Sequence, residues 1–407
     1  MLVNRYLLRG GKFASTIGAL MLCASGCAPS GDETRVQGAK ATVMGGAKAI
    51  EVGGAKATGK GGAKATEANA NTTGAKTLDV KDLLVLVDKT LEFNRDSRLL
   101  SVERNAAWQV AHGAVAYGED LKLVVGDQTL DALDYLFSGG EMRGWELTAG
   151  DTLPSTGRPS VNAYVEAGSY VGQGHVDQFL GYLSQTGLPR TTQVKVGDQS
   201  VTIEDWARTA QYQVPNNPYR EYSWTLIALT NYFPDEVTWK GADGKDWTLE
   251  PIVEFEAKQD IGNSPCGGMH RLMGLAHSVR YWKKRGEGFR GGWALAQSTV
   301  QDAIATCRKF QNSDGTFSAN YTLRPGTSSD LSTRIGTTGH TLEFLAYALE
   351  PKELQEEWVG RSVRRLCELL DVASEVELEC GGLYHGLAGL RIYRERVSES
   401  LAGGGQQ

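Results

Sequence analysis

The sequence predicts an all-α domain made of six consecutive helical hairpins, and three observations support this prediction. From Leu78 onward, apolar residues recur at three- and four-residue spacing, which is the period of an amphipathic helix. Clusters of Gly, Pro and Asp divide this pattern into twelve segments. Alternate segments are apolar on most sides, as buried helices are, and the segments between them are charged on one face. We therefore expect an inner ring of parallel helices inside an outer ring.

The twelve helices form six pairs along the chain, with short β-hairpins inserted between some of them. One hairpin is expected to join 193–196 to 200–203, and the other to join 237–240 to 245–249. The second helix of most pairs opens with glycine and histidine, whereas the first helices are more strongly charged. The expected helices span 79–93, 103–117, 127–137, 173–186, 203–213, 221–233, 250–260, 267–284, 292–310, 338–350, 352–371 and 382–396.

Composition divides the chain into three parts. Residues 1–27 begin with basic residues, continue with an apolar run and end with small residues before Cys27, which resembles the processing site of a bacterial lipoprotein. The resemblance implies lipidation of Cys27, with an ordinary signal peptide as the alternative. Residues 28–77 repeat Gly-Ala-Lys-Ala and contain few large apolar residues, so we expect a flexible tether. Residues 78–407 form the predicted folded domain.

Charge and hydropathy limit the partners of this chain. The whole sequence has a net charge of -6, and residues 78–407 are the acidic part. Nucleic acid is an unsuitable partner for an acidic domain, because phosphate binding depends on clustered Lys and Arg. No apolar stretch reaches the roughly 20 residues that a bilayer-spanning helix needs. We therefore expect attachment through an N-terminal lipid, in the cell envelope and facing the periplasm or the exterior.

Two short motifs resemble those of the α/α-toroid superfamily, which includes terpenoid cyclases, prenyltransferase β-subunits and lanthionine cyclases. The stretch 310–317, Phe-Gln-Asn-Ser-Asp-Gly-Thr-Phe, is similar to the turn that tightens successive hairpins in triterpene cyclases. The stretch 385–389, His-Gly-Leu-Ala-Gly, is similar to a helix start of lanthionine cyclases. The resemblance implies an (α/α)6 toroid, in a lipoprotein branch of the superfamily. The acid motif of the protonating cyclases and the zinc-binding Cys-His dipeptide are absent, so the chemistry does not transfer.

Histidines provide the strongest signal of a functional site. Five of the six stand near the starts of expected inner helices, and Glu221 stands at the start of the remaining one. If the inner helices share one direction, these side chains meet at one opening, where imidazole and carboxylate can act as acid and base. The alternative is that the histidines bond neighbouring hairpins and close the ring. The candidate catalytic residues are His112, His175, Glu221, His270, His340 and His385.

Three further residues are candidates for substrate binding. Trp224 is expected to line the wall of the opening. Glu343 lies three residues after His340, so it could orient that imidazole or form an ordinary pair on one helix face. Arg324 lies in a long loop that could reach over the opening, or could simply be solvated.

A weak repeat raises the alternative of a zinc site. Cys266 and Cys380 each precede two glycines and then a histidine, so two thiols and two imidazoles occur at similar helix starts. These atom types suit tetrahedral zinc, although packed free cysteines are the commoner outcome.

The leading prediction from the sequence is an envelope hydrolase or lyase that acts on a glycan or related polar substrate in a histidine-rich pocket. One alternative is a non-catalytic binding or scaffold protein. Another is a zinc-dependent toroid enzyme.

Overall fold

The computed structural model describes residues 79–219 and 221–403, and these residues are mainly helical, as the sequence predicted. The expected signal peptide at 1–27, the tether at 28–77 and Cys27 lie outside the described residues. No helix between residues 79 and 403 combines the length and the apolar character needed to cross a membrane.

Twelve α-helices occur among the described residues, in the order that the sequence predicted. They are α1 (Val80–Ser97), α2 (Ala107–Tyr117), α3 (Ala132–Phe137), α4 (Gln178–Leu183), α5 (Ile203–Gln213), α6 (Ser223–Tyr232), α7 (Leu249–Ala257), α8 (Met269–Lys284), α9 (Gly291–Phe310), α10 (Leu331–Ala348), α11 (Glu357–Val372) and α12 (Cys380–Gly403).

Three helices have bounds that differ from the prediction for identifiable reasons. The segment 127–137 is a helix only from Ala132, because a strand precedes it. The segment 173–186 is reduced to α4, since Asp177 has a left-handed backbone (φ 58°) that ends any helix before it. The helix predicted at 338–350 begins at Leu331, because the Asp330 carboxylate accepts a hydrogen bond from the Thr333 amide (2.6 Å) and caps it.

Four small sheets decorate the described helices, and the sequence predicted two of them. The predicted hairpins are β6 (Gln193–Val196) with β7 (Gln199–Thr202), and β8 (Trp239–Lys240) with β9 (Asp246–Trp247). The sequence missed the antiparallel pair β4 (Leu147–Thr152) and β5 (Pro159–Ala163). It also missed a three-stranded sheet of β1 (Leu100–Ser101), β2 (Lys122–Val125) and β3 (Gln128–Asp131).

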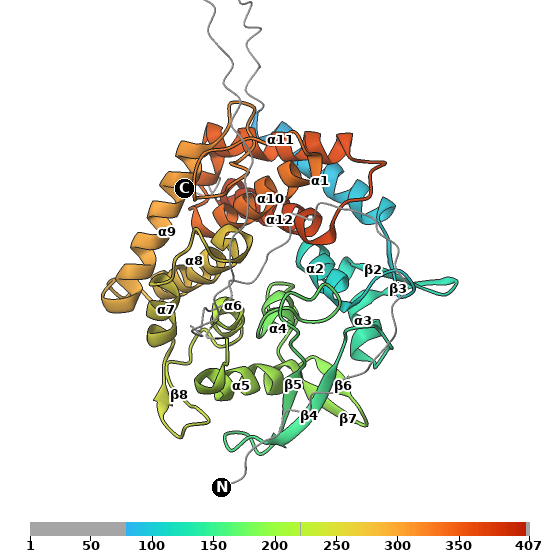
Figure 1. Cartoon of the computed structure of the whole chain (residues 1–407), viewed down its shortest axis with the longest axis vertical. Coiled ribbons are helices and arrows are strands. Elements are labelled where there is room, and N and C mark those ends of the chain that lie inside the picture. The colour runs from blue at the N-terminus through green and yellow to red at the C-terminus, as the bar shows by residue number, and fades with distance from the viewer. Residues whose placement is uncertain (1–78, 220, 404–407) are drawn as a thin grey trace, which may run out of the picture.

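The even-numbered helices pack against one another in a closed cycle. Each of α2, α4, α6, α8 and α10 contacts the next even-numbered helix, and α12 contacts α2. Figure 1 shows these six helices in the middle of the view, with α1, α11, α9, α7, α5 and α3 around them. Burial follows the same division, because α6 is buried at every residue except Asn231, whereas α11 buries one face.

The described inner helices run in the same direction. Histidines from the first turns or the middle of α2, α8, α10 and α12 lie together, away from the C-terminal ends of these helices. The C-terminal parts of α4, α6, α8, α10 and α12 line one cavity at the other end. The N-terminal halves therefore share one end of the ring, and the C-terminal ends share the opposite end.

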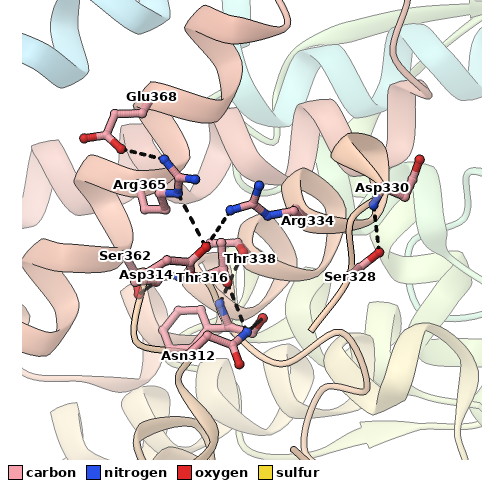
Figure 2. Close-up of polar contacts among 12 residues, drawn as sticks. Asn312, Asp314, Thr316, Ser328, Asp330, Arg334, Thr338, Ser362, Arg365 and Glu368 are labelled. Carbon is pink, nitrogen blue, oxygen red and sulfur yellow. Dashed lines mark hydrogen bonds and ion pairs between the residues drawn. The ribbon is translucent and has the colours of Figure 1, made fainter. Parts of the chain in front are cut away.

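The turn that follows α9 joins three helices through side-chain contacts. Gln311 Nε2 donates to the Trp358 carbonyl (2.7 Å) and to Ser362 Oγ (2.6 Å), both in α11. The Asp314 carboxylate bonds Arg334 Nη2 of α10 at 2.5 Å, and Figure 2 shows it between Arg334 and Arg365. These contacts fix the α9–α10 connection against α11.

Helices α10 and α12 approach closely because glycines face each other across the contact. A Cβ atom added at Gly339 would lie 2.6 Å from Gly386 Cα, and one added at Gly389 would lie 2.8 Å from the Glu343 amide nitrogen. A Cβ added at Gly386 would instead meet Gly339 Cα at 3.6 Å, an ordinary contact distance. The two sides of this contact therefore differ in their tolerance of alanine.

We predict that Gly339→Ala lowers the free energy of unfolding by about 1 to 3 kcal/mol, because the two backbones must separate. Gly386→Ala, on the facing helix, is the matched control and should change stability much less. Urea unfolding followed by circular dichroism measures both variants. Equal losses for the two variants would contradict the asymmetry of this contact.

Candidate functional site

The structure brings together all five histidines that the sequence singled out. The imidazoles of His340 and His385 are the closest pair, with ring centroids 4.0 Å apart. His270 lies between its neighbours, 5.4 Å from His175, 5.6 Å from His385 and 5.9 Å from His340. His112 lies 5.2 Å from His385 and completes the histidine cluster.

Only His270 lies in the first turn of its helix, because His112 and His385 are each the sixth residue of α2 and α12, and the other two lie farther from a helix start. His340 lies in the interior of α10, because that helix begins at Leu331. His175 lies in the segment before α4, because the left-handed Asp177 delays the helix until Gln178. The positive ends of the helix dipoles therefore do not converge on one layer, since dipole effects fall off within the first turn.

Glu343 bonds a different histidine from the one predicted. Its Oε2 lies 2.6 Å from His385 Nδ1, whereas His340 Nδ1 bonds the Gly336 carbonyl at 2.9 Å. The close approach of α10 and α12 carries Glu343 across to the neighbouring helix. Burial raises the pKa of Glu343 to about 8 and lowers the pKa of His385 to about 4. Both directions favour a pair without net charge at neutral pH.

A second carboxylate–histidine pair lies on the other side of His270. His175 Nδ1 is 2.9 Å from Glu221 Oε2, and both side chains keep some exposure. We assign the Nδ1 proton to a hydrogen bond donated to the carboxylate, which places the imidazole lone pair on Nε2. Glu221 precedes α6 by two residues, at the helix start where the sequence placed it, and joins the cluster through His175.

His112 is held by two hydrogen bonds in the interior of the cluster. Its Nδ1 donates to the Trp108 carbonyl (2.7 Å), and its Nε2 accepts from the Tyr182 hydroxyl (2.8 Å). Sequence reasoning missed Tyr182. The available signal was its position on the predicted inner helix, two turns after His175. Because both nitrogens are used, His112 positions its neighbours.

Cys266, His270 and His340 form a group of three potential metal ligands. One ligand atom from each lies within 4.8 Å of the other two. His270 is 5% exposed, and neither of its ring nitrogens has a hydrogen-bond partner among the described residues. A buried polar atom without a partner is costly, and a metal ion would satisfy one of these nitrogens. The residues present therefore fit a metal ion.

Three consecutive residues with left-handed backbone place the Cys266 side chain beside His270 and His340. Cys266 has φ 52°, an uncommon value for a residue with a side chain, and Gly267 and Gly268 also have positive φ. A Cβ atom at Gly268 would lie 2.1 Å from the Ile261 carbonyl oxygen, so the third left-handed position requires glycine. Strain of this kind concentrates at functional sites.

Cys380 does not join the cluster as the repeat had suggested. It is the first residue of α12 and already helical, whereas Cys266 precedes α8 in a left-handed segment. The two Cys-Gly-Gly stretches therefore have different backbone conformations, and only Cys266 belongs to the group of potential metal ligands.

The three predicted binding residues have different positions. Trp224 is buried and its ring lies 5.0 Å from His270, so it packs against the cluster. Glu343 bonds His385. Arg324 is exposed, and its carbonyl accepts a hydrogen bond from Ser318 Oγ (2.7 Å), so it lies outside the buried cluster. The loop that carries Arg324 does reach the cluster, through Tyr321, whose ring is 6.2 Å from His340.

Comparison of the chain with protein-family models, with curated proteins and with solved structures found no match.

The histidine cluster is deeper than an open pocket would be. His112, His270, His340 and His385 are each at most 6% exposed, and His175 is the most accessible of the five. The cavity of about 760 Å³ at the other end of the ring is lined by none of them. Among the described residues, His175 is the most accessible part of the cluster, and the loop with Tyr321 lies beside His340.

The buried titratable groups give the chain a definite response to acid. Burial lowers the pKa of five histidines below 6.5, so each takes up a proton on unfolding once the pH falls below that value. Burial raises the pKa of three carboxyls, and two of them, Asp177 with a pKa of about 6 and Glu343 with a pKa of about 8, hold protons that the unfolded chain has lost at the same pH. The histidines are His112, His270, His277, His340 and His385, and the carboxyls are Asp177, Glu256 and Glu343.

We predict that stability is greatest above pH 6.5 and falls as the pH drops toward 5. The unfolded chain binds about two more protons in this range, which corresponds to about 3 kcal/mol per pH unit. Urea unfolding followed by tryptophan fluorescence measures the slope. His277→Gln should make it shallower and Glu343→Gln should make it steeper. Stability that is constant or rises between pH 6.5 and 5 would show that the histidines are not held neutral.

Proposed function

We propose that residues 78–407 form an (α/α)6 toroid of the kind found in the α/α-toroid superfamily. The closed cycle of even-numbered helices supports this assignment, as does their common direction. The Gln311–Phe317 turn also supports it, because it ties successive hairpins together as the similar turn of triterpene cyclases is expected to do.

We propose that the histidine cluster is the catalytic centre of a hydrolase or lyase that acts on a polar substrate such as a glycan. The observation that carries this proposal is the pair of carboxylate–histidine contacts on either side of His270. Environments that push two titratable groups in opposite directions mark an acid and a base. The His385–Glu343 pair shows such opposite shifts, because burial raises the pKa of Glu343 to about 8 and lowers that of His385 to about 4.

The roles of the two pairs follow from their protons. At neutral pH the His385–Glu343 pair has no net charge, so one proton lies between Oε2 and Nδ1 and another remains on Nε2 of His385. His385 is therefore the proposed general acid. In the His175–Glu221 pair the lone pair on Nε2 makes His175 the proposed general base. Glu343 and Glu221 act through these histidines as positioning residues.

We also propose that the centre contains zinc, held by Cys266, His270 and His340. The unpartnered nitrogens of His270 and the strained backbone of Cys266 support this choice. His340 is oriented for the role, because its Nδ1 donates to the Gly336 carbonyl and leaves Nε2 as the ligand atom. Bound zinc would supply a Lewis acid beside the two proton-transfer histidines.

The depth of the cluster favours a second candidate, a non-catalytic binding or scaffold protein. Four imidazoles that are at most 6% exposed could fill the ring as a packed polar layer. In that case their substitution would affect folding, and no substrate would be turned over.

We propose that the chain is exported and anchored to a membrane by a lipid on Cys27. The basic start and the small residues before Cys27 support it. A lipid at this position would attach the toroid to a membrane through residues 28–77.

We predict that the purified full-length chain contains about one equivalent of zinc, as a single three-ligand site requires. Cys266→Ser, His270→Ala and His340→Ala should each reduce the zinc content strongly. Cys380→Ser is the matched control and should leave it unchanged. Elemental analysis by mass spectrometry measures the metal. A wild-type chain with only trace metal, or an equal loss in Cys380→Ser, would rule out this ligand set.

We predict that Glu343→Gln lowers kcat by roughly 100-fold to 10,000-fold, the usual contribution of a general acid or base. Activity of the wild type should fall as the pH rises through about 8, where the pKa of Glu343 lies, and this limb should vanish in the variant. The measurement is a pH profile of kcat on a substrate found by screening glycans. His277→Gln, at the other end of the ring, is the control. Failure to turn over any substrate, with the fold intact, would favour the scaffold candidate.

A further inference from the structure

A cavity opens at the end of the ring opposite to the histidine cluster. It has a volume of about 760 Å³, within the range of small-molecule sites. The cavity exists because α4 and α6 end at Leu183 and Tyr232, whereas α8 and α12 continue to Lys284 and Gly403 and form two of its walls. Its lining is predominantly polar and charged, so it is not a packing defect of the apolar core.

The wall formed by α8 carries uncompensated positive charge. His277, Arg280, Tyr281 and Lys284 follow one another at helical spacing and all line the cavity. Among the described residues, no carboxylate forms an ion pair with Arg280 or Lys284. The next basic residue, Arg285, lies 3.3 Å from the Glu287 carboxylate and is already engaged.

The arginines of α12 that line the cavity, unlike Arg280 and Lys284, form hydrogen bonds within the protein. Arg391 donates to the Val115 carbonyl (3.0 Å) and to Glu395 (2.7 Å). Arg396 donates to the carbonyls of Ala346 (2.5 Å) and Leu349 (2.6 Å). These guanidinium groups satisfy carbonyls at the ends of inner helices, where the helix dipole is negative. They account for two of the five cations in the cavity, whereas Arg280 and Lys284 form no such hydrogen bond with the described residues.

The acidic residues that face the cavity do not balance these cations. They are Asp235, Glu395 and Glu399, against Arg280, Lys284, Arg285, Arg391 and Arg396. Glu395 is engaged by Arg391.

The buried groups beside the cavity respond to this excess of positive charge. Burial, followed by the charges of Arg280 and Lys284, lowers the pKa of His277 to about 3, and its Nε2 has no partner among the described residues. Burial, followed by the charge of Arg280, lowers the pKa of Arg396 to about 10. An anion placed among these groups would relieve their mutual repulsion.

We propose that this cavity is a binding site for a small anionic ligand, whose carboxylate or phosphate group is held by Arg280 and Lys284. A guanidinium can bond either group through two nitrogens, and a lysine adds a point charge. Tyr281 and Tyr347 provide ring surface for the remainder of the ligand. The site is separate from the histidine cluster and does not depend on the function proposed for it.

The test uses the full-length chain with inorganic phosphate and citrate as probes, in isothermal titration calorimetry at constant ionic strength. We expect saturable binding of at least one probe with a stoichiometry of about one, as for a single pocket. Arg280→Gln and Lys284→Gln should each weaken it by about tenfold or more, as expected for loss of a charge-assisted hydrogen bond. Lys283→Gln is the matched control, because it removes the same charge from the adjacent residue. Lys283 pairs with Glu350 outside the cavity, so this variant should bind the probe as the wild type does.

Several results would overturn the proposal. They are the absence of saturable binding, an equal loss in Lys283→Gln, or a loss in His270→Ala with no change in Arg280→Gln. The last result would place the anion at the histidine cluster. Lys284 is exposed, so Lys284→Gln should fold normally and keep the test decisive if Arg280→Gln does not fold.

Discussion

Burying several imidazoles in one layer requires that they stay neutral, and most of the site follows from that constraint. A charged histidine would lose its hydration in the interior and repel its neighbours, so burial lowers the pKa of His385 to about 4 and that of His340 to about 3. Neutral imidazole has one donor and one acceptor, and each nitrogen then needs a partner. His112 finds two partners, whereas His270 finds none among the described residues. The need for partners therefore points to His270 as the position where something else binds.

The two ends of the ring have opposite chemistry because the inner helices share a direction. At one end, glycines allow α10 and α12 to approach until Glu343 reaches a histidine of the adjacent helix. At the other end, the last carbonyls of the inner helices attract arginines, which Arg391 and Arg396 provide. The same parallel arrangement thus produces a neutral, buried cluster at one end and a cationic cavity at the other.

The sequence predicted the parts of this structure that depend on periodicity. Twelve helices follow from the spacing of apolar residues, and the meeting of five histidines follows from their positions in or just before alternate helices, although their distances from the helix starts differ. It could not predict the pairing of Glu343, because a spacing of three residues suggests His340 and only the contact between two helices selects His385. It also could not separate Cys266 from Cys380, since the two share a local sequence and differ in backbone conformation.

The buried histidine cluster can take part in a reaction if the loop that covers it moves while the inner helices around it stay fixed. The walls are inner helices, whose packing leaves little freedom. The cover includes Tyr321, which has a left-handed backbone (φ 53°). A Cβ atom added at Gly267 would lie 2.2 Å from Cδ2 of the Tyr321 ring. Gly267 therefore lets an aromatic ring rest directly on the backbone beside Cys266. Because a ring held by a strained turn in a loop costs less to displace than a helix, the packing beside Cys266 and His340 is easiest to open at Tyr321.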